Sequence, residues 1–301
     1  MTMFRGLSAF PITPADADGR VDTEALGRMV TRLCAAEVDS IGLLGSTGTY
    51  AYLSREERGR AVAAAAEAVA GRIPLVVGIG ALRTDTVMAL ARDSERAGAD
   101  ALLLAPVSYT PLIPAEVFEH FRATAAATGL PICIYNNPGT THFSFDLSLL
   151  QRLADLPGIA AAKMPLPADI PLAEDLARLR AALPESFSIG YSGDWGCSEA
   201  LLAGADAWFS VIGGLMPEAT LQLARAASSG NRVETARIEA RFAPIWDLFR
   251  SFGSLRVVYA IAGLMGVTRA DPPRPILPLE GQDLDRVAAA LEHLAAAGPV
   301  A

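Results

Sequence analysis

The chain has 301 residues, a length that fits either two domains of roughly 150 residues or one α/β barrel of about 250 residues with an appendage. Apolar residues make up 51% and charged residues 19% of the sequence, and the mean hydropathy is +0.32, which excludes a disordered or collagen-like chain. The formal net charge is −8 and the sequence has no basic run, so we expect no nucleic-acid partner.

The sequence also indicates in which cellular compartment the protein is expected. No apolar run free of charged residues reaches the roughly 18 residues that a transmembrane helix needs, and the first residues show no signal-peptide pattern. Cys34, Cys133 and Cys197 are few, odd in number and widely spaced, which argues against a secreted disulfide scaffold. We therefore expect a cytoplasmic protein that has no membrane contact.

Short strand-like runs alternate with helical patterns at intervals of about 30 residues. In chain order the eight predicted strands are Gly6–Ile12, Ser40–Leu44, Pro74–Ile79, Ala101–Leu104, Pro131–Tyr135, Ile159–Lys163, Phe187–Tyr191 and Ala207–Val211. Most are continuous apolar runs, which is typical of parallel strands that are covered on both faces.

The segments between the strands have helical spacing. Asp22 is predicted to cap a helix whose apolar face carries Leu26 and Leu33, and Thr84 is predicted to cap the helix that carries Leu90. Eight such βα units predict an α/β fold, a closed (β/α)₈ TIM barrel, and a doubly wound parallel sheet is the alternative.

The barrel is predicted to be complete near residue 230. We therefore divide the chain into a barrel over residues 1–230 and a C-terminal helical extension over residues 231–301. Two later helices are expected at Arg256–Gly266 and Asp283–Ala297. The first helix of the extension is predicted from an apolar stripe of Ile238, Phe242, Ile245, Trp246 and Phe249.

One basic residue differs from all the others. Of the 25 basic residues, 24 are arginine and one, Lys163, is lysine. Arginine replaces lysine at most surfaces, but its guanidinium stays protonated and cannot act as a neutral amine. Lys163 also ends the sixth predicted strand, and barrel enzymes carry their active sites at the carboxyl ends of the strands. The small apolar run before it is expected to desolvate the ammonium in part, which favours the free amine that forms Schiff bases with carbonyl substrates.

Two further strand ends supply candidate groups. Tyr135 ends the fifth predicted strand, and neighbouring strands lie about 4.8 Å apart, so its phenol can approach Lys163 and shuttle protons. After the second strand, the turn Gly45-Ser46-Thr47-Gly48-Thr49 offers backbone N–H groups and the hydroxyls of Ser46 and Thr47 to a carboxylate. Each feature also has a structural alternative: a lysine paired with a carboxylate, a packed ring, and a turn that needs glycine.

No metal site or cofactor is expected. His120, His142 and His293 are scattered without metal-ligand spacing, and no nucleotide-binding glycine motif occurs. Gly213-Gly214, after the eighth strand, leaves open a phosphate-binding barrel isomerase.

At these residues the chain resembles the dihydrodipicolinate synthase and N-acetylneuraminate lyase superfamily of class I aldolases. The resemblance covers the barrel and is specific as a set, although no single motif is. The matching motifs are Phe10-Pro11-Ile12-Thr13-Pro14, Gly45-Ser46-Thr47-Gly48, Tyr135-Asn136-Asn137-Pro138, Lys163 and Ser192-Gly193-Asp194.

The resemblance implies a small-molecule 2-oxo acid substrate, of the pyruvate type, that is bound as a Schiff base on Lys163. It implies that Tyr135 relays protons and that Ser46 and Thr47, with Gly48 beside them, hold the substrate carboxylate. It also implies a homotetramer built as a dimer of dimers. On the eighth strand, Phe209 and Ser210 correspond to the pocket wall of the family.

Four positions depart from the pattern of the synthases in that family. Thr49 stands where the family has a glutamate, and Met164 stands where an acidic residue usually follows the lysine. The tyrosine that a neighbouring subunit contributes falls at Ser108, with Tyr109 one place later. The arginine after the Tyr-Asn-x-Pro motif falls at Thr140, so the carboxylate of aspartate semialdehyde loses its expected partner.

These observations predict a Schiff-base-forming lyase that uses neither metal nor cofactor. Its reaction would be aldol cleavage or condensation with pyruvate, or dehydration of a 2-keto-3-deoxy acid. The alternatives are dihydrodipicolinate synthase proper and a barrel that binds 2-oxo acids without catalysis. The residues predicted to serve in proton relay or specificity are Thr49, Ser108, Tyr109, Thr140 and His142.

Overall fold

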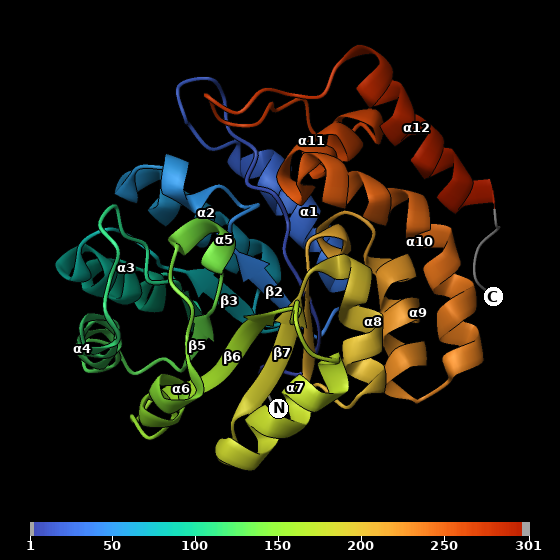
Figure 1. Cartoon of the computed structure of the whole chain (residues 1–301). Coiled ribbons are helices and arrows are strands. Elements are labelled where there is room, and N and C mark those ends of the chain that lie inside the picture. Colours follow the sequence, from blue (N-terminus) through green and yellow to red (C-terminus); the bar gives the residue numbers. More distant parts are fainter. Residues whose placement is uncertain (1–2, 297–301) are drawn as a thin grey trace.

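Eight parallel strands form a closed ring in which each strand pairs with its neighbours in chain order and β1 pairs with β8. Figure 1 shows strands of this ring, among them β2, β3, β5, β6 and β7, with helices around them. The computed structural model describes residues 3–296 of the chain. The predicted barrel is confirmed, and the doubly wound sheet is excluded because a closed ring has no edge strands. The strands are β1 (Gly6–Ala9), β2 (Ser40–Leu43), β3 (Leu75–Gly78), β4 (Ala101–Leu104), β5 (Ile132–Tyr135), β6 (Ile159–Pro165), β7 (Ser188–Ser192) and β8 (Ala207–Ser210).

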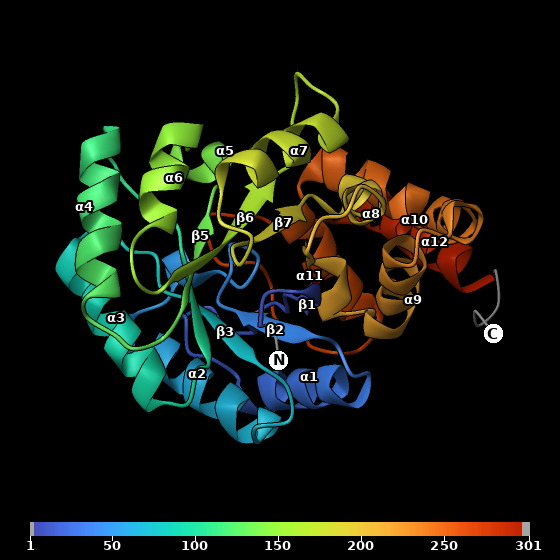
Figure 2. The same cartoon turned by 90° about the horizontal axis from the view of Figure 1, so that it is seen from below.

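Helices surround this ring and continue beyond it. Figure 2, turned by 90° from Figure 1, shows α10 and α12 outside α8 and α9, on one side of the barrel. The helices and 3₁₀ turns are α1 (Thr23–Ala35), η1 (Tyr50–Tyr52), α2 (Arg55–Val69), α3 (Thr84–Arg96), α4 (Pro114–Ala125), α5 (Pro138–Thr141), α6 (Leu147–Ala154), α7 (Leu172–Ala182), α8 (Asp194–Leu202), η2 (Ile212–Gly214), α9 (Pro217–Ser228), α10 (Arg232–Phe252), α11 (Ser254–Leu264) and α12 (Gly281–Ala296).

The predicted boundaries agree with the structure to within two residues for every strand except β1. β1 ends at Ala9, three residues early, because Pro11 has no N–H to donate to a neighbouring strand. The Asp22 cap is confirmed, since its side chain accepts a hydrogen bond from the N–H of Ala25. The Thr84 cap is wrong: the N-cap position is Arg83, and the Thr84 hydroxyl is paired instead with the His120 imidazole of α4.

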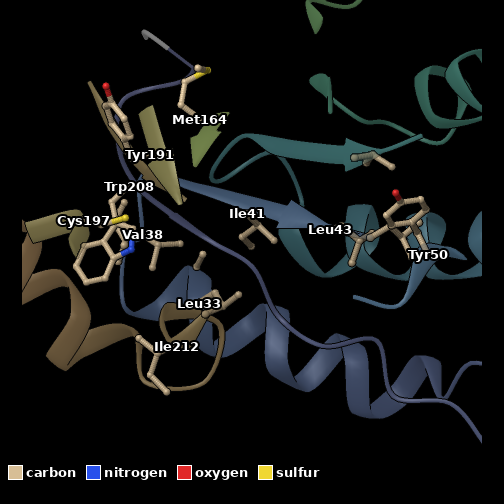
Figure 3. Close-up of a cluster of buried hydrophobic side chains, with 14 of the residues drawn as sticks. Leu33, Val38, Ile41, Leu43, Tyr50, Met164, Tyr191, Cys197, Trp208 and Ile212 are labelled. Atoms are coloured by element: carbon tan, nitrogen blue, oxygen red, sulfur yellow. The ribbon is translucent and has the colours of Figure 1, made fainter. Parts of the chain in front are cut away.

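Side chains along the strands alternate between the barrel interior and the layer shared with the helices. Part of the outer layer, around Ile41, Cys197 and Trp208, is drawn in Figure 3. Small residues fill much of the interior and leave room for three rings at its carboxyl-terminal end. The interior cluster comprises Phe4, Phe10, Val76, Ala101, Leu103, Ala105, Cys133, Tyr135, Ala161, Ala207 and Phe209.

The extension packs on the barrel through α10, which contacts α8 and α9. The predicted apolar stripe of α10 is buried, and within it the rings of Phe242 and Trp246 stack with their centroids 5.0 Å apart. The two later helices correspond to α11 and α12, although Ala297 lies outside the described residues. No helix within residues 3–296 is both long enough and apolar enough to cross a bilayer. The boundary near residue 230, between α9 and α10, stays a proposal.

Candidate active site

Lys163 lies on β6 near the carboxyl-terminal end of the barrel. Its register partners are Tyr135 on β5 and Gly190 on β7, so the lysine and the tyrosine stand side by side. Only 3% of Lys163 is exposed to solvent. The side chain belongs to the barrel interior, where one strand side chain in two points inward.

Three aromatic rings surround the Lys163 amine. The Nζ atom lies 4.0 Å from the centre of the Phe10 ring, 4.2 Å from that of Tyr135 and 5.7 Å from that of Phe209. Among the described residues, no carboxylate forms an ion pair with Lys163, which excludes the purely structural alternative of a lysine paired with an acid. Ring faces attract a cation, so the three rings can hold the end of the Lys163 side chain in place inside the barrel.

Two glycines make room for these rings. A Cβ atom on Gly42 would lie 2.2 Å from Cζ of Phe10, and a Cβ on Gly190 would lie 2.6 Å from Cε2 of Phe209. Neither distance is compatible with a side chain larger than hydrogen. The two phenylalanine rings then meet edge to face, with their centroids 6.1 Å apart. The enclosure of the amine therefore depends on glycines that lie on strands other than its own.

The Tyr135 hydroxyl has two hydrogen-bond partners. Ser46 Oγ lies 2.7 Å from it, with either oxygen able to donate, and Asn137 Nδ2 donates to it at 2.9 Å. Because Asn137 already donates, the phenol keeps its own proton available for Ser46 or for another acceptor. This arrangement joins the turn after β2 to the strand beside Lys163.

The turn over residues 45–49 is held tightly. Thr47 and Gly48 are buried, and a Cβ on Gly48 would lie 3.0 Å from the Gly45 nitrogen. Thr49 has a left-handed backbone, with φ at 55°, and its side chain is hydrogen-bonded to Tyr259 of α11. Burial raises the pKa of Tyr259 to about 12, and this hydrogen bond opposes the rise. Thr49 thus faces the helical extension, while Ser46 faces Tyr135.

Phe209 and Ser210 project to opposite sides of β8. The Phe209 ring belongs to the interior cluster. The Ser210 hydroxyl accepts a hydrogen bond from the Gly213 N–H at 3.0 Å, and the Ser210 carbonyl accepts one from the Phe10 N–H at 2.8 Å. Ser210 is fully buried, and its hydroxyl is also hydrogen-bonded to the Asp194 carboxylate, so its polar groups are engaged at the end of β8.

The remaining predicted residues lie on loops at the same end of the barrel. The Ser108 hydroxyl donates to the Thr110 carbonyl, and Tyr109 is 96% exposed. Thr140, on α5, is exposed and donates to the Asn137 carbonyl at 3.3 Å. His142 follows α5 and is also exposed. Within the part of the chain that the structure describes, none of these four residues forms a hydrogen bond or an ion pair with Lys163 or Tyr135.

The structure adds site residues that we did not single out from the sequence. Phe10 and Asn137 lie inside the matching motifs, so their positions were visible although their contacts were not. Tyr50 gave no signal: it is buried beside Tyr135, and burial raises its pKa, with the neighbouring phenol as the second cause. The guanidinium of Arg58 lies 5.4 Å from the centre of the Tyr50 ring. Among residues 3–296, no group of three His, Cys, Asp or Glu side chains is placed to hold a metal ion.

The chain is similar to known proteins over most of its length. The model of the Dihydrodipicolinate synthetase family matches residues 3–294. A 4-hydroxy-tetrahydrodipicolinate synthase of Corynebacterium aurimucosum is 33% identical over 284 residues, which cover 94% of this chain and 90% of that relative.

Solved structures are similar in fold over nearly the whole chain. A crystal structure described as dihydrodipicolinate synthase from Agrobacterium tumefaciens is 60% identical, with a TM-score of 0.96 over 97% of this chain and 99% of that one. A chloride-inhibited dihydrodipicolinate synthase from Acinetobacter baumannii, complexed with pyruvate, is 27% identical, with a TM-score of 0.88 over 97% of this chain and 99% of that one. The chain therefore belongs to the dihydrodipicolinate synthetase family.

Proposed function

We propose that this protein is a Schiff-base-forming lyase that acts on pyruvate or another 2-oxo acid through Lys163. The observation that carries the proposal is the placement of the only lysine of the chain, buried among three rings and beside a hydrogen-bonded tyrosine. Amine chemistry is the task that arginine cannot perform, and every other basic side chain is an arginine or a histidine. Relatives that are named as synthases of this family support the proposal.

The proposed reaction begins when the neutral Lys163 amine attacks the keto carbon of the substrate. A carbinolamine forms, and loss of water from it gives a protonated imine. Tyr135 would supply the proton that the departing hydroxyl needs, so that it leaves as water, and the Ser46 hydroxyl would relay a proton from solvent back to the phenolate. The imine then withdraws electrons from the neighbouring carbon, so a C–C or C–O bond beside it can break or form through the enamine. The backbone N–H groups of the turn over residues 45–49 would hold the substrate carboxylate.

The second reactant is proposed to be uncharged. Charge-assisted pairing of a second carboxylate is worth about 1.5–3 kcal/mol, and arginine provides it with two parallel hydrogen bonds. Thr140 and His142 supply no fixed positive charge on the loop after β5. We therefore favour a polyhydroxylated aldehyde-side group, or a hydrophobic one seated near Phe143 and Phe209. The second candidate is dihydrodipicolinate synthase proper, which the names of the relatives favour.

We also propose a homotetramer, built as a dimer of dimers, in the cytoplasm. Large apolar side chains are exposed on neighbouring loops: Tyr109 is 96%, Leu82 67% and Ile113 58% exposed. Such side chains are typical of a surface that a second copy covers. Tyr109, more than the partly buried Ser108, is free to reach the site of a neighbouring copy. The free thiols of Cys34, Cys133 and Cys197 fit a reducing compartment.

A phosphate-binding isomerase receives less support. It would need free backbone N–H groups at Gly213 and Gly214, after β8. The Gly213 N–H already donates to Ser210 Oγ, and the Gly214 N–H donates to the Val211 carbonyl. Both donors are therefore occupied within the turn.

Borohydride reduction in the presence of pyruvate tests the proposal. The imine becomes a stable secondary amine, and peptide mass spectrometry should find it on Lys163, since the only other primary amine is the N-terminus. Lys163→Arg is the matched control, because it keeps the positive charge and removes the amine. If no 2-oxo acid gives an adduct on Lys163 while pyruvate still raises the melting temperature, the protein is a non-catalytic binding barrel.

A further inference from the structure

A buried carboxylate lies behind β8, on the side away from the barrel interior. Asp194 is the first residue of α8, and only 2% of it is exposed. Its carboxylate accepts hydrogen bonds from Trp208 Nε1 at 2.8 Å, from the Ile212 N–H at 2.8 Å and from the Val211 N–H at 3.1 Å. Figure 3 shows the Trp208 indole in the outer core layer, with Cys197 and Ile212 near it. Among the described residues no cation is paired with Asp194.

These hydrogen bonds do not serve α8 itself. The N-cap of α8 is Gly193, and no side chain caps this helix end. All the partners of Asp194 belong to β8 or to the chain just after it. Desolvation raises the pKa of Asp194, and hydrogen bonds from Ile212, Trp208, Val211 and the Ser210 side chain oppose that rise. A buried acid without a cation is costly unless donors satisfy it, and here β8 and its turn supply the donors.

The segment that Asp194 holds is the one that places two of the rings around Lys163. Phe209 lies between Trp208 and Ser210, and the Ser210 carbonyl accepts the Phe10 N–H at 2.8 Å. After the turn, a Cβ on Gly214 would lie 2.5 Å from the Phe10 carbonyl oxygen, so the chain passes directly against Phe10. A shift of this segment would therefore move both phenylalanines.

We propose that Asp194 is a positioning residue that fixes the end of β8 and, through it, the aromatic enclosure of the Lys163 amine. It acts by holding Val211 and Ile212 from behind, so that Phe209 and Phe10 keep their faces toward Nζ. The proposal rests on the proposed function, because imine formation is its readout. It goes beyond that function because Asp194 touches neither the amine nor any residue of the turn over residues 45–49.

Because Asp194 lies near β8 and the proposed carboxylate cradle lies after β2, a change at Asp194 should alter the rate of imine formation without altering the affinity for pyruvate. Loss of the hydrogen bonds from Val211 and Ile212 to Asp194 should slow imine formation on Lys163, because a displacement of about 1 Å at a reacting group can cost roughly 10²-fold in rate. The concentration of pyruvate that half-saturates trapping should stay the same, because the proposed carboxylate cradle lies after β2. A merely structural role predicts only a smaller folded fraction, with unchanged kinetics per folded molecule.

The experiment compares borohydride trapping rates of wild type and Asp194→Asn across pyruvate concentrations, normalised to folded protein by near-ultraviolet circular dichroism. We expect a roughly 10²-fold slower maximal rate at an unchanged half-saturating concentration. Wild type that traps neither pyruvate nor any other 2-oxo acid would refute the proposed function; wild type that traps normally, with Asp194→Asn equal to it, would refute only the Asp194 proposal. A raised half-saturating concentration without a slower rate would refute it as well.

A second variant isolates the hydrogen bond. In Asp194→Asn the side-chain amide can accept hydrogen bonds from the Val211 and Ile212 N–H groups only when its NH₂ group points toward the Trp208 indole N–H. Two hydrogen-bond donors then face each other. Trp208→Phe removes that donor, so the double variant should trap pyruvate faster than Asp194→Asn alone. A double variant slower than Asp194→Asn would overturn the proposal. If Asp194→Asn does not fold, Asp194→Glu decides, because its longer side chain keeps the charge but moves the carboxylate away from the Val211 and Ile212 N–H groups: we expect slower trapping at unchanged half-saturation, and a wild-type rate overturns the proposal.

Discussion

Lys163 and Tyr135 are register partners on adjacent strands, and the lysine amine lies 4.2 Å from the centre of the tyrosine ring. The tyrosine therefore presents its ring to the amine and its hydroxyl to Ser46, 2.7 Å away. One side chain thus carries two separable contributions: a ring face that encloses the amine, and an O–H group that can move a proton.

Tyr135→Phe should separate these contributions, because it keeps the ring and removes only the hydroxyl. We expect an adduct on Lys163 still to form with pyruvate, and turnover to fall by about 10²–10⁴-fold, the usual contribution of a positioned acid or base. Ser46→Ala is the graded comparison, with about a tenfold loss from one hydrogen bond. Steady-state kinetics beside borohydride trapping measure both effects. Turnover of Tyr135→Phe equal to that of Ser46→Ala would contradict the relay role.

Thr140→Arg should improve activity toward aspartate semialdehyde. A guanidinium on the loop after β5 would pair with the second carboxylate, and the expected gain in kcat/KM is roughly 10- to 100-fold. Wild type should stay below about 10⁴ M⁻¹s⁻¹ with pyruvate and aspartate semialdehyde. Thr140→Gln, which is long but uncharged, is the matched control. Wild-type efficiency above that value would establish synthase activity and show that a cation elsewhere, such as Arg83, restores the site.

Gly190→Ala should damage both stability and imine formation. The new Cβ would lie 2.6 Å from the Phe209 ring and 2.6 Å from the Ala207 carbonyl oxygen, so ring or backbone must move. Such overpacking costs about 1–3 kcal/mol, and displacement of Phe209 should slow trapping on Lys163. Gly27→Ala, in α1, is the control: nothing lies within 4 Å of its Cβ, so it should be neutral or stabilising. Denaturant unfolding measures the loss of stability. If Gly190→Ala were as stable as wild type, the close packing of Phe209 and Ala207 against Gly190 would be contradicted.

Glu239→Gln should remove a pH dependence of stability. Desolvation raises the pKa of Glu239 above its ordinary value of 4.5, and hydrogen bonds from Ser198 and Trp246 only oppose this rise. The unfolded state therefore loses this proton at lower pH than the folded state does, and the free energy of unfolding falls as pH rises through that window. Glutamine stays neutral and can still accept from Trp246.

Thermal melts from pH 4.5 to pH 8 measure this effect. The melting temperature of Glu239→Gln should exceed that of wild type by an amount that grows with pH and reaches about 2 °C or more. Glu185→Gln, on the exposed turn before β7, serves as the control and should track wild type at every pH. A constant difference between Glu239→Gln and wild type would show that packing, and not ionisation, is responsible.

The sequence by itself determined the barrel and singled out Lys163 as the candidate reactive residue. Apolar runs that alternate with helical patterns give eight βα units, since each pattern reflects which faces a segment must bury. Lys163 stood out because arginine occupies nearly all other basic positions, and its place at a strand end follows from the same periodicity. The prediction for Thr84 failed because a tertiary partner, His120, competes for its hydroxyl with the local helix end.

Only the tertiary structure decided which groups meet around that residue. Phe10, Tyr135 and Phe209 are far apart along the chain, and barrel closure through the β1–β8 pairing brings their rings to one amine. Strand register also decides whether a side chain at a strand end points into the barrel or away from it. On β8 it turns Phe209 toward Lys163 and Ser210 toward Gly213. The sequence near each of these residues does not predict such long-range contacts. Each contact depends on where a distant strand ends, and that position is set only when the barrel closes.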